Sequence, residues 1–154
     1  MSLHAPPLHG SLPPEGAAPP RGGPAAGHSP APLAPVQPVI LRDHGVRLEP
    51  LALAHEEGLR AAAADGRLWE IRVTSVPEPE NTRAYIETAL KMREEGHRFA
   101  FAVIDEASGR VLGSTSYHDI IPAVRRVEIG YTWYAQGVQR SHVNTTCKLL
   151  MMGH

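Results

Sequence analysis

Two side chains that can transfer protons lie close together in the C-terminal half of the sequence. His118 belongs to the stretch VLGSTSYHDI, and Glu128 is the only carboxylate in the middle of RRVEIGYTWYA. Imidazole and carboxylate groups commonly act as general acids and bases. Both residues are therefore candidates for accepting a proton from a substrate. The competing interpretations are a solvated Glu128 paired with Arg125 or Arg126, and a structural histidine near the end of a strand.

The run QRSHVNT, from Gln139 to Thr145, has a composition suited to binding an anion. Backbone N–H groups at a helix N-terminus bind phosphate, because they have no partner within the helix and lie at the positive end of the helix dipole. Arg140 adds a cation, and short polar side chains that favour a helix start follow at Ser141, Asn144 and Thr145. The run therefore predicts a site for a diphosphate.

The histidines and the single cysteine show no metal-binding pattern. No two of the six histidines after residue 38 show i,i+4 spacing on one predicted helix, and none pairs with Cys147 as a zinc site would require. We therefore expect no metal site. One cysteine allows no internal disulfide, which fits a reducing cytoplasm.

The elements that must position these residues lie after a proline-rich N-terminal segment. Residues 1–38 hold eleven of the fifteen prolines and only two charged side chains, Glu15 and Arg21. A segment without a periodic apolar face cannot offset the entropy of ordering it. We expect a disordered Pro/Ala/Gly-rich tail over residues 1–38, or a misplaced translation start, with a recognition arm for a proline-binding module as the less favoured alternative.

The charge balance and the apolar patterning exclude several classes of partner. Residues 39–154 carry fourteen Lys and Arg against fifteen Asp and Glu, which gives no reason to expect nucleic acid or an anionic membrane. No stretch approaches the roughly 18 apolar residues of a membrane span, and prolines interrupt every candidate signal peptide. We therefore expect a cytoplasmic protein.

The first half of the remaining sequence predicts one strand or hairpin and two helices. VILRDHGVRLEPL (39–51) has an apolar side that suits a strand, or a hairpin around Asp43 to Gly45. Helical spacing follows in residues 51–66 and, more clearly, in residues 77–96, where Gly96 is a stop signal. The connection 67–78 carries Trp69, which could line a substrate cleft or anchor the loop as a buried tryptophan.

Three strands and the start of a helix complete the pattern. RFAFAVID (98–105) and VLGSTSYHDI (111–120) form a predicted hairpin with Gly109 in its turn. In RRVEIGYTWYA (125–135), strict alternation places Val127, Ile129, Tyr131 and Trp133 on one face and Glu128, Gly130, Thr132 and Tyr134 on the other. Antiparallel strands with separate helices indicate an α+β fold.

This order of elements resembles the N-terminal two thirds of the GNAT superfamily of acyl-coenzyme A dependent N-acetyltransferases. The branch typified by the ribosomal-protein alanine acetyltransferases is the most similar. The stretches that carry the resemblance are VRLEPL, VLGSTSYHDI and RRVEIGYTWYAQGVQRSHVNTTCKLL. The resemblance implies a mixed, mainly antiparallel sheet flanked by helices, and a partial N-acetyltransferase domain over residues 39–154.

The resemblance also implies acetyl-coenzyme A as the cofactor. Pantetheine would lie along the strand 125–135, and backbone N–H groups near Tyr134 and Ala135 would polarise the thioester carbonyl. The superfamily's phosphate turn begins at Gln139, but His142 and Asn144 replace its two small residues. The implied cofactor-binding residues are Trp133, Tyr134, Ala135, Gln139, Arg140, Ser141, His142, Val143, Asn144 and Thr145.

The acceptor would be an amine of a protein N-terminus or of a small molecule. Within the resemblance, Glu128 is the general base, directly or through water, and His118 is the second candidate. Tyr117 and Trp69 are the implied substrate contacts.

The superfamily fold continues with further strands beyond the point where this sequence ends. The sequence ends at His154 while Leu149, Leu150, Met151 and Met152 still need a sheet to cover. We therefore expect an incomplete chain whose strand 125–135 is an exposed edge available for self-association. The alternative to an enzyme is a non-catalytic remnant or assembly module that uses this edge.

Overall fold

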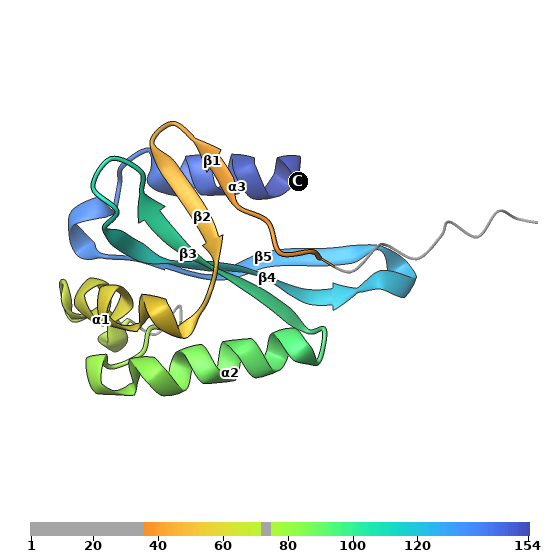
Figure 1. Cartoon of the computed structure of the whole chain (residues 1–154), viewed down its shortest axis with the longest axis horizontal. Helices are drawn as coiled ribbons and strands as arrows, with labels where there is room; N and C mark the ends of the chain where they lie inside the picture. Colours follow the sequence, from red (N-terminus) through yellow and green to blue (C-terminus); the bar gives the residue numbers. More distant parts are fainter. Residues whose placement is uncertain (1–35, 72–74) are drawn as a thin grey trace, which may run out of the picture. The chain divides into compact units, whose positions relative to one another are not determined.

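The computed structural model describes residues 36–71 and 75–154 (Figure 1). The tail expected over residues 1–38 lies almost entirely outside the described residues, so its disorder and the domain boundary after Pro38 stay predictions. Residues 72–74 of the connection between the two helices also lie outside. Residues 36–40 have no regular secondary structure.

The described chain forms a hairpin, two helices, three strands and a final helix. Short 3-10 turns connect several of these elements, among them η2 (Leu68–Glu70), η4 (Pro122–Val124) and η5 (Gln136–Val138). The strands and α-helices are β1 (Leu41–Asp43), β2 (Val46–Pro50), α1 (Glu56–Ala64), α2 (Thr82–Glu94), β3 (Arg98–Asp105), β4 (Val111–Ile121), β5 (Arg126–Tyr134) and α3 (Val143–Gly153).

The strands form one sheet in the order β1-β2-β3-β4-β5, with every neighbouring pair antiparallel. The α+β class is therefore confirmed, and the sheet is antiparallel throughout the described residues rather than mixed. The hairpin alternative for residues 39–51 is also confirmed, because His44 and Gly45 both have positive φ in the turn between β1 and β2. The predicted stop of α2 at Gly96 is correct, since Gly96 has φ +78° directly after the helix.

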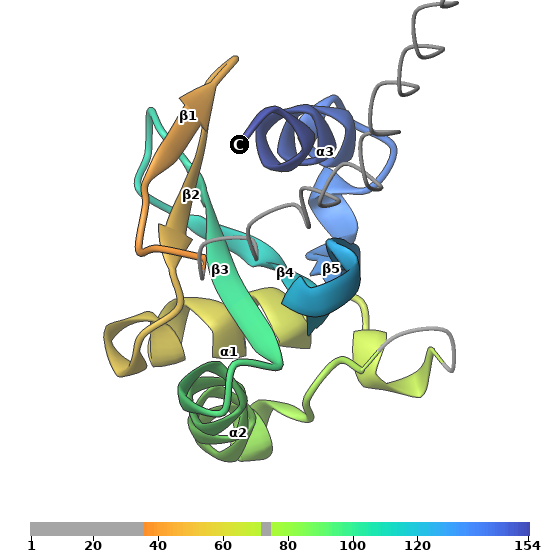
Figure 2. The ribbon, with the colours of Figure 1, turned by 90° about the vertical axis from the view of Figure 1, so that its right-hand side faces the viewer.

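The sheet separates two layers of helices (Figures 1 and 2). Helices α1 and α2 pack on one face, where β3 contributes Ala100, Ala102 and Ile104. Helix α3 packs on the other face, where β3 contributes Phe99, Phe101 and Val103. Since β3 is covered on both sides, its sequence is apolar at successive positions instead of alternating. We call these two surfaces the α1/α2 face and the α3 face.

Strand β5 departs from the strict alternation predicted for it. Ser114 pairs with Trp133 and Ser116 pairs with Gly130, so β5 has one extra residue between these pairs. This β-bulge includes Tyr131, whose φ is +48°. The prediction that Ile129 and Trp133 share a face is therefore wrong. Ile129 packs in the core under α3, whereas Trp133 is buried in the core under α1 and α2.

Helix α3 begins where the sequence predicted a helix start. Its buried apolar side chains, Val143, Cys147 and Met151, pack on the α3 face, whereas Leu149 and Met152 are exposed. Among the described residues, no helix has both the length and the apolar composition needed to cross a membrane.

Candidate active site

The two proton-transfer candidates meet on the α1/α2 face of the sheet. His118 on β4 pairs directly with Glu128 on β5. The His118 ring also makes an edge contact with the Tyr131 ring, with centroids 5.2 Å apart. This packing requires Gly130, because a Cβ there would lie 2.3 Å from His118 Nε2. The bulge and the glycine together thus fix the position of the imidazole.

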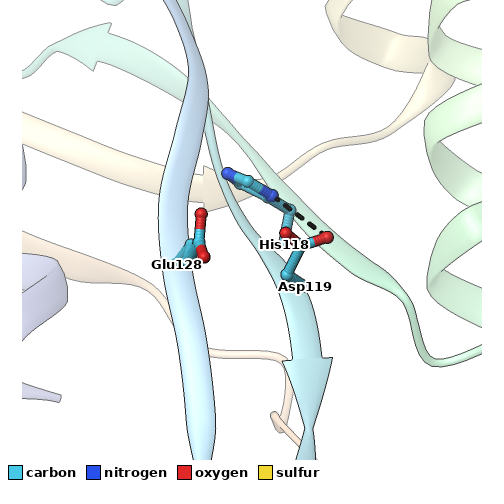
Figure 3. Close-up of side chains that lie close together, drawn as sticks. All are labelled: His118, Asp119 and Glu128. Atoms are coloured by element: carbon cyan, nitrogen blue, oxygen red, sulfur yellow. Dashed lines mark ion pairs between the residues drawn. The ribbon is translucent and has the colours of Figure 1, made fainter.

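A third polar side chain, Asp119, joins this pair (Figure 3). One side-chain nitrogen of His118 and one carboxylate oxygen each of Asp119 and Glu128 lie within 4.8 Å of one another. His118 Nδ1 is 3.6 Å from Asp119 Oδ1, and Arg126 forms an ion pair with Glu128. Such a cluster can orient an imidazole and share a proton. Spacing along the sequence could not indicate it, because the pairing of β4 with β5 and a positive φ at Asp119 bring the groups together.

A cavity of about 430 Å³ opens beside the cluster, between α2 and the sheet. We call it the acceptor-side cavity. Its walls include Tyr85 from α2, Arg98 from β3 and Tyr131 from the β5 bulge. Sequence reasoning missed Tyr85 and Arg98. Tyr85 is only one residue of the predicted helix 77–96, and Arg98 is only the first residue of the predicted strand 98–105.

A second cavity, of about 210 Å³, lies at the C-terminal end of β5. Its walls include Thr132, Trp133, Tyr134 and Gln139, and we call it the strand-end cavity. Val76 lines both cavities. The hydroxyl of Tyr85 also connects them, because it accepts hydrogen bonds from Trp133 Nε1 at 3.3 Å and from Arg98 Nη2 at 2.9 Å.

The backbone N–H groups of Tyr134 and Ala135, at the end of β5, point to opposite sides of the strand. Ala135 N–H donates to the Leu112 carbonyl at 2.8 Å, so its expected role in polarising a carbonyl is wrong. Backbone N–H groups alternate between the two sides of a strand, so that of Tyr134 faces the edge of β5 that pairs with no strand among the described residues. The Tyr134 carbonyl on the same edge accepts a hydrogen bond from Gln139 Nε2 at 3.2 Å.

The start of α3 leaves backbone donors without a partner in the helix. The first turn closes with Thr146 N–H donating to the His142 carbonyl at 2.9 Å, so the N–H groups of Asn144 and Thr145 precede the helical ladder. The Asn144 side chain accepts a hydrogen bond from Tyr134 Oη at 3.2 Å. Arg140 is exposed and forms no ion pair with another residue that the structure describes.

The remaining residues of the predicted anion run face other parts of the molecule. Ser141 Oγ donates to the Val138 carbonyl at 2.6 Å and accepts from Val143 N–H at 3.3 Å. His142 Nε2 lies 3.1 Å from the His44 carbonyl oxygen in the β1–β2 turn. Val143 is the first residue of α3, and its side chain is buried against the sheet. Only its backbone is therefore available to a ligand at the start of the helix.

Neither of the two expected substrate contacts lines the acceptor-side cavity or the strand-end cavity. Trp69 lies in η2, half-buried, and lines neither cavity. Tyr117 is buried on the α3 face, where its hydroxyl donates to the Met151 carbonyl and burial raises the pKa of its phenol. The alternation of β4 explains this result, because neighbouring residues of a strand point to opposite faces.

Buried hydroxyl and thiol groups gather where β5 meets α3. Burial raises the pKa of Tyr134 above its ordinary value, with a smaller contribution from Cys147. Burial likewise raises the pKa of the Cys147 thiol to about 11. Both groups are therefore protonated at neutral pH and act there as packing and hydrogen-bonding groups.

The fold and the matched sequence agree with one family. A family model described as an acetyltransferase (GNAT) domain matches residues 46–154. A search of curated proteins found no match.

Solved structures show the same arrangement of elements. A GCN5-related N-acetyltransferase from Brucella melitensis is 27% identical, with a TM-score of 0.67 over 79% of this chain and 56% of that chain. A probable acetyltransferase of the GNAT family from Chromobacterium violaceum is 20% identical, with a TM-score of 0.68 over 93% and 69%. The ribosomal L7/L12 alpha-N-protein acetyltransferase RimL, in complex with coenzyme A, is 17% identical, with a TM-score of 0.63 over 75% and 67%.

The chain thus spans between about half and about two thirds of the length of these proteins. The family match covers most of the described residues, including both cavities, the His118 cluster and the start of α3. The chain belongs to the GNAT acetyltransferase domain family.

Proposed function

We propose that this protein is a cytoplasmic acetyl-coenzyme A dependent N-acetyltransferase that acetylates an amine of a protein N-terminus or of a small molecule. The observation that carries the proposal is the connection between the two cavities. Val76 lines both cavities, and Tyr85 in the wall of the acceptor-side cavity accepts a hydrogen bond from Trp133 in the wall of the strand-end cavity. The strand-end cavity includes Gln139, which precedes α3, and the acceptor-side cavity includes Tyr131, whose ring contacts His118. Two reactants bound in adjoining cavities can meet without diffusing through solvent.

The residues at the end of β5 and the start of α3 fit the cofactor. The N–H groups of Asn144 and Thr145, with the Arg140 guanidinium nearby in the sequence, suit a diphosphate. The N–H of Tyr134, which faces the open edge, suits an oxyanion. When bound, acetyl-coenzyme A supplies a thioester whose carbonyl an amine can attack.

The acceptor must lose a proton before it can attack, since amines are protonated at neutral pH. Glu128 can accept this proton directly or through water, and His118 beside it is the second candidate. Asp119 would hold the His118 ring through Nδ1. Tyr85 and Tyr131 would line the place where the amine binds.

A thermal-shift titration of the full chain with acetyl-coenzyme A tests the cofactor site. A ligand that binds only the native state adds about 2.7 kcal/mol to the free energy of unfolding at 100 times its Kd. We expect a saturable shift that decreases in Arg140→Ala and persists in Lys148→Ala, which removes the same charge from an exposed position later on α3. A cooperative transition that acetyl-coenzyme A never moves would refute cofactor binding.

A second candidate function is an assembly module that pairs through β5. The specific observation is that β5 is an edge strand of the described sheet and borders an apolar cavity of about 530 Å³ lined by Tyr117, Ile129 and Met151. Exposed edge strands pair readily with other strands. Oligomers that persist without nucleotide in light scattering would favour this function, and a uniform monomer would exclude it.

A further inference from the structure

Arg98 is a buried cation in the wall of the acceptor-side cavity. It is the first residue of β3 and is only 3% exposed. Charged side chains are rarely buried to this extent unless an opposite charge accompanies them. The environment of Arg98 therefore bears on what the cavity binds.

The hydrogen-bond partners of this guanidinium are all neutral. Nε donates to Ser116 Oγ at 2.9 Å, and Nη2 donates to Tyr85 Oη at 2.9 Å. Nη1 donates to no residue in the described part of the chain. No carboxylate in that part forms an ion pair with Arg98, and none of the described residues that line the cavity is acidic.

Two aromatic rings hold the guanidinium in place. Its Cζ lies 4.1 Å from the Tyr131 ring centroid and 5.3 Å from that of Tyr85. Aromatic faces stabilise a cation and offset part of its desolvation. They leave Nη1 and the second N–H of Nη2 as a planar fork for a carboxylate, the geometry that arginine binds best.

The same tyrosine places this fork beside the proposed catalytic cluster. Tyr131 contacts Arg98 with its ring and makes the edge contact with His118. Arg98 also pairs with His118 in the β3–β4 register. A ligand carboxylate on Arg98 would therefore hold the rest of the ligand close to His118 and Glu128.

We propose that the acceptor-side cavity is a carboxylate subsite, in which Arg98 selects amines that carry a carboxylate close to the amino group. This inference rests on the proposed acetyltransferase function for its catalytic meaning, but it concerns binding. The carboxylate can belong to a free amino acid or to an acidic side chain next to a peptide N-terminus. These two sources share one chemistry and are separated by experiment.

Matched ligands test the subsite in the unmodified full chain. The first pair is glycine and glycinamide, and the second is the tripeptide amides Ala-Glu-Ala and Ala-Gln-Ala. Dissociation constants come from NMR chemical-shift titrations with and without coenzyme A. A charge-assisted bidentate pair predicts roughly tenfold or tighter binding of the carboxylate member. The pair that shows this preference identifies the source of the carboxylate.

Two substitutions assign the preference to the guanidinium. In Arg98→Gln the ratio between the two members should fall to about one. Arg98→Lys, which keeps the charge without the planar fork, should retain an intermediate ratio. The matched control is Arg93→Gln, because Arg93 is also stacked on an aromatic ring, at 4.5 Å from the Phe99 centroid, yet does not line the cavity. Thermal unfolding of each variant shows whether it folds.

The results separate this inference from the proposed function. Equal binding of both members of each pair, absence of binding, or a preference that persists in folded Arg98→Gln would overturn the subsite. If both Arg98 variants fail to fold, the ratio of the two dissociation constants in the unmodified chain still tests whether the cavity prefers a carboxylate. Carboxylate preference without acetyl transfer to any amine would remove the acetyltransferase function and keep the subsite, whereas transfer without preference would do the reverse.

Discussion

Tyr131 contacts both the proposed carboxylate-binding residue, Arg98, and the proposed proton acceptor, His118. Its φ of +48° is unfavourable for a bulky side chain, which costs about 1–2 kcal/mol at a single position. The conformation turns the ring toward Arg98 and His118 on the α1/α2 face. The residue with the strained backbone is therefore also the one whose ring contacts both Arg98 and His118.

The general-base assignment predicts a kinetic effect without a loss of folding. Glu128→Gln and His118→Gln remove the two proton acceptors, and removal of a general base lowers kcat by about 10²–10⁴-fold. Steady-state rates of acetyl transfer as a function of pH measure the effect for each variant. The exposed Glu57 on α1 supplies the control Glu57→Gln, which should retain full activity. If Glu128→Gln stays fully active, Glu128 is a surface carboxylate paired with Arg126.

Gly130 permits a sharper test of the His118 position. In Gly130→Ala the new Cβ would meet His118 Nε2 at 2.3 Å, so the imidazole must move. We expect acetyl transfer to fall by at least tenfold, because small displacements of a catalytic group are costly. Circular dichroism and the NMR shifts of the His118 ring separate this local change from unfolding. Gly153→Ala is the control, since a Cβ there has no neighbour within 4 Å.

Among the elements, β5 is the one whose local geometry could not be predicted from the sequence. Element types, their order and the sites of the turns at Gly45, Gly96 and Gly109 could be predicted, because turn residues and periodicity are local properties. The bulge at Tyr131 could not be predicted, since one extra residue in β5 is only defined against β4. The same limit hid Arg98 and Asp119, whose roles arise from pairing across strands.

The interface of α3 with the sheet predicts loss of stability at alkaline pH. Burial raises the pKa of Tyr117 and Tyr134, and raises that of Cys147 from 9.0 to about 11. The folded state therefore retains protons that the unfolded state releases, so the free energy of unfolding falls as pH rises. For Cys147 the contribution is complete below pH 9 and is lost between about pH 9 and 11.

Urea unfolding at a series of pH values measures this dependence. The free energy of unfolding should decline steadily above about pH 9. Cys147→Ala should reduce the slope, since it removes one of the three groups. A slope that is identical in the variant would show that the thiol titrates alike in both states.

At the scale of the whole molecule, helices cover both faces of the sheet, and β5 is one of the two edge strands among the described residues. Val127 on β5 and Met152 on α3 are 44% and 67% exposed, and the chain spans 56% of the Brucella melitensis neighbour. Exposed apolar groups beside an open edge favour association. The same edge carries the N–H of Tyr134, so strand pairing and cofactor binding would use one surface.

If chains associate through β5, a positive charge introduced on that strand should weaken the association. Val127→Lys on the edge strand should shift any oligomer toward monomer in light scattering, because a lysine disfavours strand pairing. Val124→Lys is the matched control, since Val124 is exposed but lies in η4 and not on the strand. Equal effects of the two substitutions would exclude β5 as the association surface.

The bond from Trp133 to Tyr85 gives the protein an optical reporter. The sequence holds only two tryptophans, and Trp69 lines neither cavity. In Trp69→Phe, the remaining indole donates to the hydroxyl that also accepts from Arg98. Any ligand that draws Arg98 away from Tyr85 will alter the polarity around that indole, so the fluorescence of Trp133 can follow the filling of the acceptor-side cavity in real time.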